Sequence, residues 1–159
     1  MPPPLILDPT KVDPDRVLYA REEIYRALPQ QFEFAQLDAI CYYDPQQRIA
    51  AAVRDIRLDE WWVRGHIPGR PIFPGVLMLE AVAQLSAYTC KYMHGYQGMI
   101  AYGGVDNCKF RAPVIPPTRL LLFCRETDNR ARRIICETQA LMKGALVFEA
   151  TITGLAMPD

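Results

Sequence analysis

One stretch of the chain, GHIPGRPIFPGVLMLEAVAQLSAY at residues 65–88, combines residue types that could perform acid–base chemistry. It holds His66 in a segment rich in proline and glycine, followed by an apolar run in which Glu80 is the one charged residue. Prolines restrict the backbone around a turn, so such a segment would hold His66 with little conformational freedom. A fixed histidine and a carboxyl on the following helix are candidates for a general base and a general acid.

Glu80 is expected to be buried, because the helix predicted around it is apolar on nearly every side. Burial of an ionised carboxylate alone is costly, so Glu80 should have a raised pKa, a partner, or both. Gln84 lies four residues on, on the same helical face, and is the expected hydrogen-bond partner. Two interpretations stay open from these residues: a catalytic acid, or a buried glutamate that backbone groups satisfy for structural reasons alone.

Gly75 falls where the predicted helix begins. Backbone N–H groups are unpaired there and the helix dipole is positive, while a glycine lets a ligand oxygen approach closely. The N–H of Gly75 is therefore a candidate oxyanion donor. With His66 and Glu80 it supplies the parts needed to remove a proton beside a carbonyl and to expel a β-substituent. The second histidine, His94, is expected to be an ordinary helix-end residue.

The elements that must position these residues form an α+β pattern. We expect an extended proline-rich arm, a first helix from Pro14 to Leu28 capped by Asp13, and a long helix over residues 75–94 capped by Gly95. Strand-like segments span residues 36–43, 48–58, 99–111, 119–128, 131–144 and 145–156, with turns at DPQQ, DNR and KG. Hairpin links predict a mainly antiparallel sheet, and only that sheet could bury the single long helix.

Composition excludes several classes of protein. The 159 residues carry 18 basic and 18 acidic side chains, so no global field would attract nucleic acid. Half of the residues are apolar, which excludes global disorder. Five widely spaced cysteines predict neither a disulfide framework nor a zinc site. The N-terminus lacks signal-peptide features and no window could span a membrane, so we expect a cytoplasmic protein.

The segment around His66 closely resembles the signature of the bacterial (3R)-3-hydroxyacyl-[acyl-carrier-protein] dehydratases, G-H-F-P-x-x-P-V-M-P-G-V-L followed by E-A-x-A-Q. The resemblance extends over about residues 28–156, because LPQQFEFAQLDAI is similar to the family's opening segment and GVDNCKFRAPVIP to its G-I-D-x-x-x-F-R-x-P-V-x-P strand. Ile67 replaces the family's phenylalanine, and Gln30 and Gln31 stand where it commonly carries histidine and arginine. The signature positions that match are His66, Pro68, Pro71, Pro74, Gly75, Val76, Leu77, Glu80, Ala81, Ala83 and Gln84.

This resemblance implies a hot-dog fold, in which a curved antiparallel sheet wraps around one long central helix. It implies one dehydratase domain over residues 28–159, preceded by an N-terminal arm and short helix at residues 1–27. It also implies a homodimer with shared active sites, in which His66 of one subunit faces Glu80 of the other, and a trimer of dimers is the larger assembly of the family. No metal and no organic cofactor is implied.

In the activity that the resemblance implies, His66 removes the C2 proton of a 3-hydroxyacyl thioester and Glu80 handles the departing hydroxyl. The N–H of Gly75 polarises the thioester carbonyl. A scheme centred on His66 alone would give the same product and stays open. The product is trans-2-enoyl-acyl-carrier-protein, formed in fatty-acid biosynthesis.

The implied partner is acyl carrier protein, a small acidic protein that needs a local basic patch on this neutral chain. Lys109 and Arg111, on the strand that resembles the family's F-R-x-P segment, are the first candidates, and Gln84 is assigned with them to substrate binding. A second basic cluster, Arg130 to Arg133, lies beside a hairpin turn and is more typical of a solvated edge. The alternatives are a non-catalytic scaffold that binds the carrier protein and a divergent dehydratase of a specialised lipid pathway.

Overall fold

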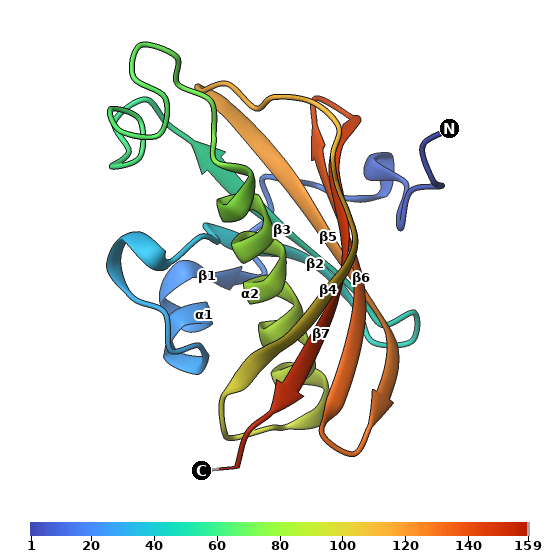
Figure 1. The fold of residues 1–159 in the computed structure, drawn as a ribbon. Coiled ribbons are helices and arrows are strands. Elements are labelled where there is room, and N and C mark those ends of the chain that lie inside the picture. The colour runs from blue at the N-terminus through green and yellow to red at the C-terminus, as the bar shows by residue number, and fades with distance from the viewer. Residues whose placement is uncertain (159) are drawn as a thin grey trace.

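A single antiparallel sheet and one long helix make up most of the computed structural model, which describes residues 1–158. The predicted domain end, Asp159, lies outside the described residues. The sheet has seven strands in the order β1-β2-β3-β5-β6-β7-β4, and each neighbouring pair is antiparallel. Figure 1 shows the curved sheet around helix α2, which confirms the predicted α+β hot-dog architecture. The elements are β1 Tyr19–Ala20, α1 Arg21–Ala27, β2 Ala39–Asp44, β3 Ile49–Ile56, α2 Gly75–His94, β4 Ile100–Phe110, β5 Thr118–Arg130, β6 Arg133–Met142 and β7 Ala145–Ala156.

Helix α2 forms the centre of the main hydrophobic core. It contacts β3, β5, β6 and β7, and side chains such as Ala81, Val82 and Leu85 have no exposed surface. Its end matches the prediction, because Gly95 adopts the left-handed conformation (φ 67°) and its N–H donates to the carbonyl of Lys91. A glycine reaches this conformation at little steric cost, so it stops the helix at a defined residue.

A second apolar core lies on the outer face of the sheet, where the N-terminal arm covers β3, β5 and β6. Ile6, Leu7 and Val12 of the arm are buried against side chains such as Phe123. The amide of Gln139 holds the arm, since its Oε1 accepts from the N–H of Ile6 at 2.7 Å and its Nε2 donates to the carbonyl of Pro4 at 3.0 Å. The arm therefore explains why residues 49–53 of β3 are apolar on both faces of the sheet.

Two sequence predictions were wrong in their boundaries. The first helix begins at Arg21 and not at Pro14, because Tyr19–Ala20 pairs with β2 and the side chain of Glu23 accepts from the N–H of Ala20 at 3.0 Å. Asp13 instead closes a turn by accepting from the N–H of Asp15. The DNR turn is also displaced, since β5 continues through Arg130 and the chain reverses at residues 131–132.

The described residues hold no disulfide. Cys41, Cys90, Cys124 and Cys136 are buried free thiols, and Cys108 is exposed. In residues 1–158 no helix is long and apolar enough to cross a membrane. Over the same range, no cluster of three or more histidine, cysteine or acidic side chains could hold a metal ion.

Candidate active site

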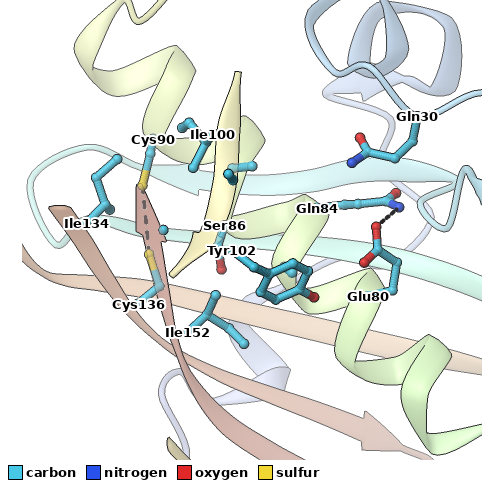
Figure 2. A pocket seen from close by; sticks show the side chains of 14 residues that line it. Gln30, Glu80, Gln84, Ser86, Cys90, Ile100, Tyr102, Ile134, Cys136 and Ile152 are labelled. Carbon is cyan, nitrogen blue, oxygen red and sulfur yellow. Dashed lines mark hydrogen bonds between the residues drawn. The ribbon is translucent and has the colours of Figure 1, made fainter. Parts of the chain in front are cut away.

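Glu80 lies in a pocket between α2 and the edge of the sheet that β4 forms (Figure 2). Among the described residues that line it, Glu80 is the one that carries a charge. The walls come from α2, β4, β6 and β7 and from the loop after α1. They are formed by Gln30, Glu80, Ala83, Gln84, Ser86, Ala87, Cys90, Ile100, Ala101, Tyr102, Ile134, Cys136, Ile152 and Gly154.

Burial raises the pKa of the Glu80 carboxyl, and hydrogen bonds from Gln84 and Tyr102 offset part of that effect. The Gln84 Nε2 donates to Glu80 Oε1 at 2.8 Å, as the i, i+4 spacing predicted. The hydroxyl of Tyr102 lies beside the carboxyl and also contacts the carbonyl of Leu79 at 3.2 Å. A carboxyl with a raised pKa holds its proton to a higher pH, which suits proton exchange with a substrate.

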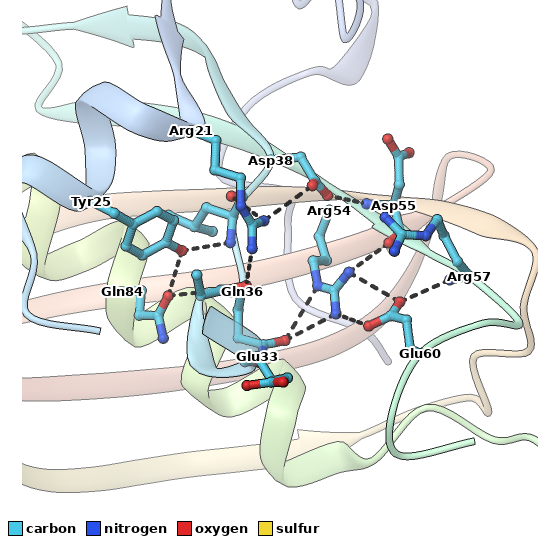
Figure 3. A network of polar contacts seen from close by, with 12 residues as sticks. Arg21, Tyr25, Glu33, Gln36, Asp38, Arg54, Asp55, Arg57, Glu60 and Gln84 are labelled. Carbon is cyan, nitrogen blue, oxygen red and sulfur yellow. Dashed lines mark hydrogen bonds and ion pairs between the residues drawn. The ribbon is translucent and has the colours of Figure 1, made fainter. Parts of the chain in front are cut away.

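Gln84 is held by four hydrogen bonds, two through each end of its amide; Figure 3 shows those of the oxygen and Figure 2 shows the contact with Glu80. Its Oε1 accepts from the Tyr25 hydroxyl at 2.7 Å and from the backbone N–H of Gln36 at 3.0 Å. Its Nε2 donates to the carbonyl of Phe34 at 2.8 Å as well as to Glu80. These contacts use both donors and both acceptor positions of the amide. The amide of Gln84 therefore has no free hydrogen-bonding group for a substrate, and its predicted role in substrate binding stays a prediction.

His66 is presented by the loop between β3 and α2. Its Nδ1 lies 2.7 Å from the carbonyl of Ile72, and a carbonyl can only accept, so Nδ1 carries the proton in the neutral ring. This leaves Nε2 with a free lone pair, as a general base requires. The backbone of the loop is fixed at His66, because the N–H of His66 donates to the carbonyl of Trp62. The buried ring of Trp62 packs on Phe73, with 5.3 Å between the ring centres.

Gly75 is the first residue of α2. A Cβ at this position would lie 2.5 Å from Cε1 of Phe110, so the missing side chain lets that ring pack on the helix. Within residues 1–158 the N–H of Gly75 donates no hydrogen bond. Its predicted role as an oxyanion donor is compatible with this position and stays a prediction.

The single chain does not bring all three predicted catalytic residues together. Neither His66 nor Gly75 lines the Glu80 pocket. Strand β4 beside that pocket forms the edge of the sheet, and it exposes apolar side chains that include Tyr102, Val105 and Phe110. The resemblance accounts for this arrangement if the histidine of each site comes from a second copy.

The two predicted basic clusters lie at opposite ends of the sheet (Figure 1). Lys109 and Arg111 stand at the end of β4 nearer the His66 loop, and Arg111 pairs with Glu149 at 2.6 Å. The β5–β6 hairpin carries the second cluster, in which Asp128 pairs with Arg130 at 3.1 Å and with Arg133 at 3.2 Å. This agrees with the prediction of a solvated edge.

Three side chains around Glu80 were not predicted from the sequence. Tyr102 and Gln30 line the pocket, and Tyr25 reaches it through Gln84. The Oε1 of Gln30 is buried and has no hydrogen-bond partner among the described residues. The signal for Tyr25 was a phenol within the apolar pattern of a short helix, and the signal for Gln30 was its departure from the resembling family.

Comparison with known proteins identifies both sequence and structural relatives. The model of the FabA-like domain family matches residues 28–151. The chain is 33% identical over 138 residues to a curated protein of Agrobacterium fabrum, 3-hydroxyacyl-[acyl-carrier-protein] dehydratase FabZ, and the match covers 86% of this chain and 89% of the relative.

Among solved structures, a chain of the dehydratase heterocomplex ApeI:P from Xenorhabdus doucetiae superposes with a TM-score of 0.72 at 10% identity. The match covers 86% of this chain and 91% of that chain. AziG from S. sahachiroi superposes with a TM-score of 0.60 at 17% identity, covering 76% and 90% of the two chains. At these identities the structural likeness shows the fold alone.

Proposed function

This chain belongs to the FabA-like domain family, and we propose that it is a dehydratase of (3R)-3-hydroxyacyl-acyl-carrier-protein thioesters in fatty-acid biosynthesis. The observation that carries the proposal in the structure is the carboxyl of Glu80, partly buried in a pocket whose other described walls are uncharged. The 33% identity to a curated 3-hydroxyacyl-carrier-protein dehydratase over most of both chains gives the reaction and the substrate class.

The proposed reaction is an acid–base elimination. His66 Nε2 removes the C2 proton, and the electron pair of that C–H bond forms the C2=C3 double bond while the C3–O bond breaks. The hydroxyl leaves as water with the proton of Glu80, and the N–H of Gly75 stabilises the charge that develops on the thioester oxygen. Proton return from His66 to Glu80 through solvent restores the starting state.

The site is proposed to form between two copies of the chain in the cytoplasm. Support comes from the edge strand β4, which lies beside the Glu80 pocket with exposed apolar side chains, and from the absence of His66 among the described residues that line that pocket. An isologous dimer would use this edge twice and would therefore create two equivalent sites.

Acyl carrier protein is the proposed partner, since the relative acts on an acyl group attached to that protein. Lys109 stands exposed near the His66 loop, whereas the charge of Arg111 is partly offset by Glu149. Arg64 and Arg70 are exposed on the loop itself, on either side of His66. Charge reversal at Lys109, Arg64 or Arg70 should therefore raise KM for the carrier-bound substrate more than it lowers kcat. Such charges attract the acidic carrier protein during association and do not take part in the chemical step.

The test is hydration of crotonyl-carrier-protein to the 3-hydroxy product, since the elimination is reversible. Wild-type protein should turn over, and His66→Ala and Glu80→Gln should each lose at least about a hundredfold, roughly 2.7 kcal/mol of barrier. Tyr96→Phe, in the segment that follows α2, is the matched control and should keep its activity. Carrier binding without turnover on any chain length would contradict the proposal and indicate a non-catalytic scaffold.

A further inference from the structure

Tyr25 joins three parts of the fold, and Figure 3 shows its hydroxyl beside Gln84. It lies on α1, its hydroxyl donates to Gln84 Oε1 at 2.7 Å, and the same hydroxyl accepts from the backbone N–H of Leu37 at 2.7 Å. A phenol has one proton, so the direction of both hydrogen bonds is fixed. Tyr25 thus links α1 and the segment at residues 34–37 to the amide on α2 that contacts Glu80.

The orientation of the Gln84 amide is unambiguous in this setting. The N–H of Gln36 can only donate and the carbonyl of Phe34 can only accept, so turning the amide over would place donor against donor and acceptor against acceptor. Gln84 therefore presents an N–H to the carboxyl of Glu80. Both groups that enforce this orientation belong to residues 34–37, the segment that the Tyr25 hydroxyl holds at Leu37.

We propose that Tyr25 is a positioning residue for Glu80, which it controls through Gln84 and the segment at residues 34–37. Tyr25 does not line the pocket, so it has no contact with a substrate there. The catalytic meaning of this inference rests on the proposed function, whereas the contact geometry exists without substrate. Removal of the hydroxyl would leave the buried Leu37 N–H without its acceptor and Gln84 Oε1 with one donor fewer.

The consequence concerns how firmly Glu80 holds its proton. A hydrogen bond to a carboxylate favours the ionised form, so a weaker N–H contact from Gln84 should raise the pKa of Glu80 further. Tyr102 is the titratable group that faces Glu80 from β4, and Cys90 and Cys136 are the other titratable groups of the pocket. On the far side, Arg21 lies 5.6 Å from the centre of the Tyr25 ring and pairs with Asp38.

The experiment measures the pKa of the Glu80 carboxyl by 13C NMR on glutamate-labelled full-length protein without substrate, with the signal assigned through Glu80→Gln. Tyr25→Phe should raise this pKa by about 0.5 unit, roughly 0.7 kcal/mol. In a Gln84→Leu background, Tyr25→Phe should cause no further rise, because the route through Gln84 is already absent. Tyr96→Phe, which also loses one phenol–amide hydrogen bond, is the control and should leave the pKa unchanged.

No shift in Tyr25→Phe would overturn the inference, and so would an equal shift in the Gln84→Leu background or in Tyr96→Phe. In the hydration assay, the acid limb of the kcat profile should move to higher pH in Tyr25→Phe, which loss of stability alone would not cause. The two proposals are separable: an inactive wild type whose Glu80 pKa responds to Tyr25→Phe would refute the dehydratase and support the positioning role.

Discussion

The ion pair between Arg54 and Glu60 provides a quantitative test of how the fold supports the histidine loop. The guanidinium donates to the carboxylate at 2.5 and 3.1 Å, and the two side chains are only 6% and 8% exposed. Glu60 also accepts from the N–H of Arg57, as Figure 3 shows, and from the Trp62 indole. Glu60→Gln keeps the shape but leaves the Arg54 charge buried without a counter-ion, which costs about 3–5 kcal/mol.

Such a loss is large against a total stability of about 5–15 kcal/mol, so urea denaturation at pH 7 should show it clearly. The control is Arg54→Met combined with Glu60→Leu, which removes both charges and should be less destabilising than Glu60→Gln alone. A loss below about 1 kcal/mol in Glu60→Gln would refute the argument that this pair is desolvated and mutually dependent.

The pH dependence of the same pair has a defined sign. Burial alone would raise the pKa of Glu60, but the hydrogen bonds from Arg54 and from the N–H of Arg57 outweigh it and lower the pKa below 4.5. A carboxyl with a lowered folded-state pKa gives stability that is present above its unfolded pKa and is lost as the pH falls through its folded pKa. The stability gap between wild type and Glu60→Gln should therefore be full at neutral pH and shrink on acidification.

Three further predictions concern the arm, the first turn of α2 and the acid. Deletion of residues 1–12 should lower the free energy of unfolding by about 2–4 kcal/mol in urea, since it uncovers the outer core, and an unchanged midpoint would refute this. The single variant Gly75→Ala should have a lower melting temperature than the double variant Gly75→Ala with Phe110→Leu, because the Phe110 ring lies 2.5 Å from the new Cβ. Equal melting temperatures would argue against the clash. In the proposed mechanism, hydration uses Glu80 as a carboxylate base, so its raised pKa should make the rate decline, as the pH falls, at a higher pH than the ordinary value of 4.5. A rate that stays constant down to that value would contradict the assignment.

Local signals in the sequence predicted the parts of the fold that depend on neighbouring residues. The apolar run of α2 and the glycine after it predicted the helix, and strand-like segments separated by turn residues predicted β2 to β7. The predicted start of the first helix was wrong because Tyr19–Ala20 pairs with Ala39 and Ile40 of β2, a long-range contact that no local pattern encodes. The hairpin turn shifted because β5 and β6 pair to their ends, at Arg130 and Arg133.

The candidate site was predictable only in its residue types and spacing. The sequence placed a hydrogen-bond partner for Glu80 at Gln84, because four residues along a helix lie on one face. It could not supply Tyr25 or Gln36, since they reach Gln84 through tertiary packing across 59 and 48 residues of chain. In the proposed dimer, His66 of one copy faces Glu80 of the other, and no intrachain pattern determines such a contact.

The most direct test of a shared acid–base site is subunit complementation between two inactive variants. His66→Ala and Glu80→Gln would be co-expressed with different tags, and the mixed dimer would be isolated and assayed for hydration of crotonyl-carrier-protein. In that dimer one site lacks both groups and the other has both intact, so about half of the wild-type activity should return, while each variant alone stays inactive. A mixed dimer as inactive as its parents would contradict a site built from His66 of one subunit and Glu80 of the other.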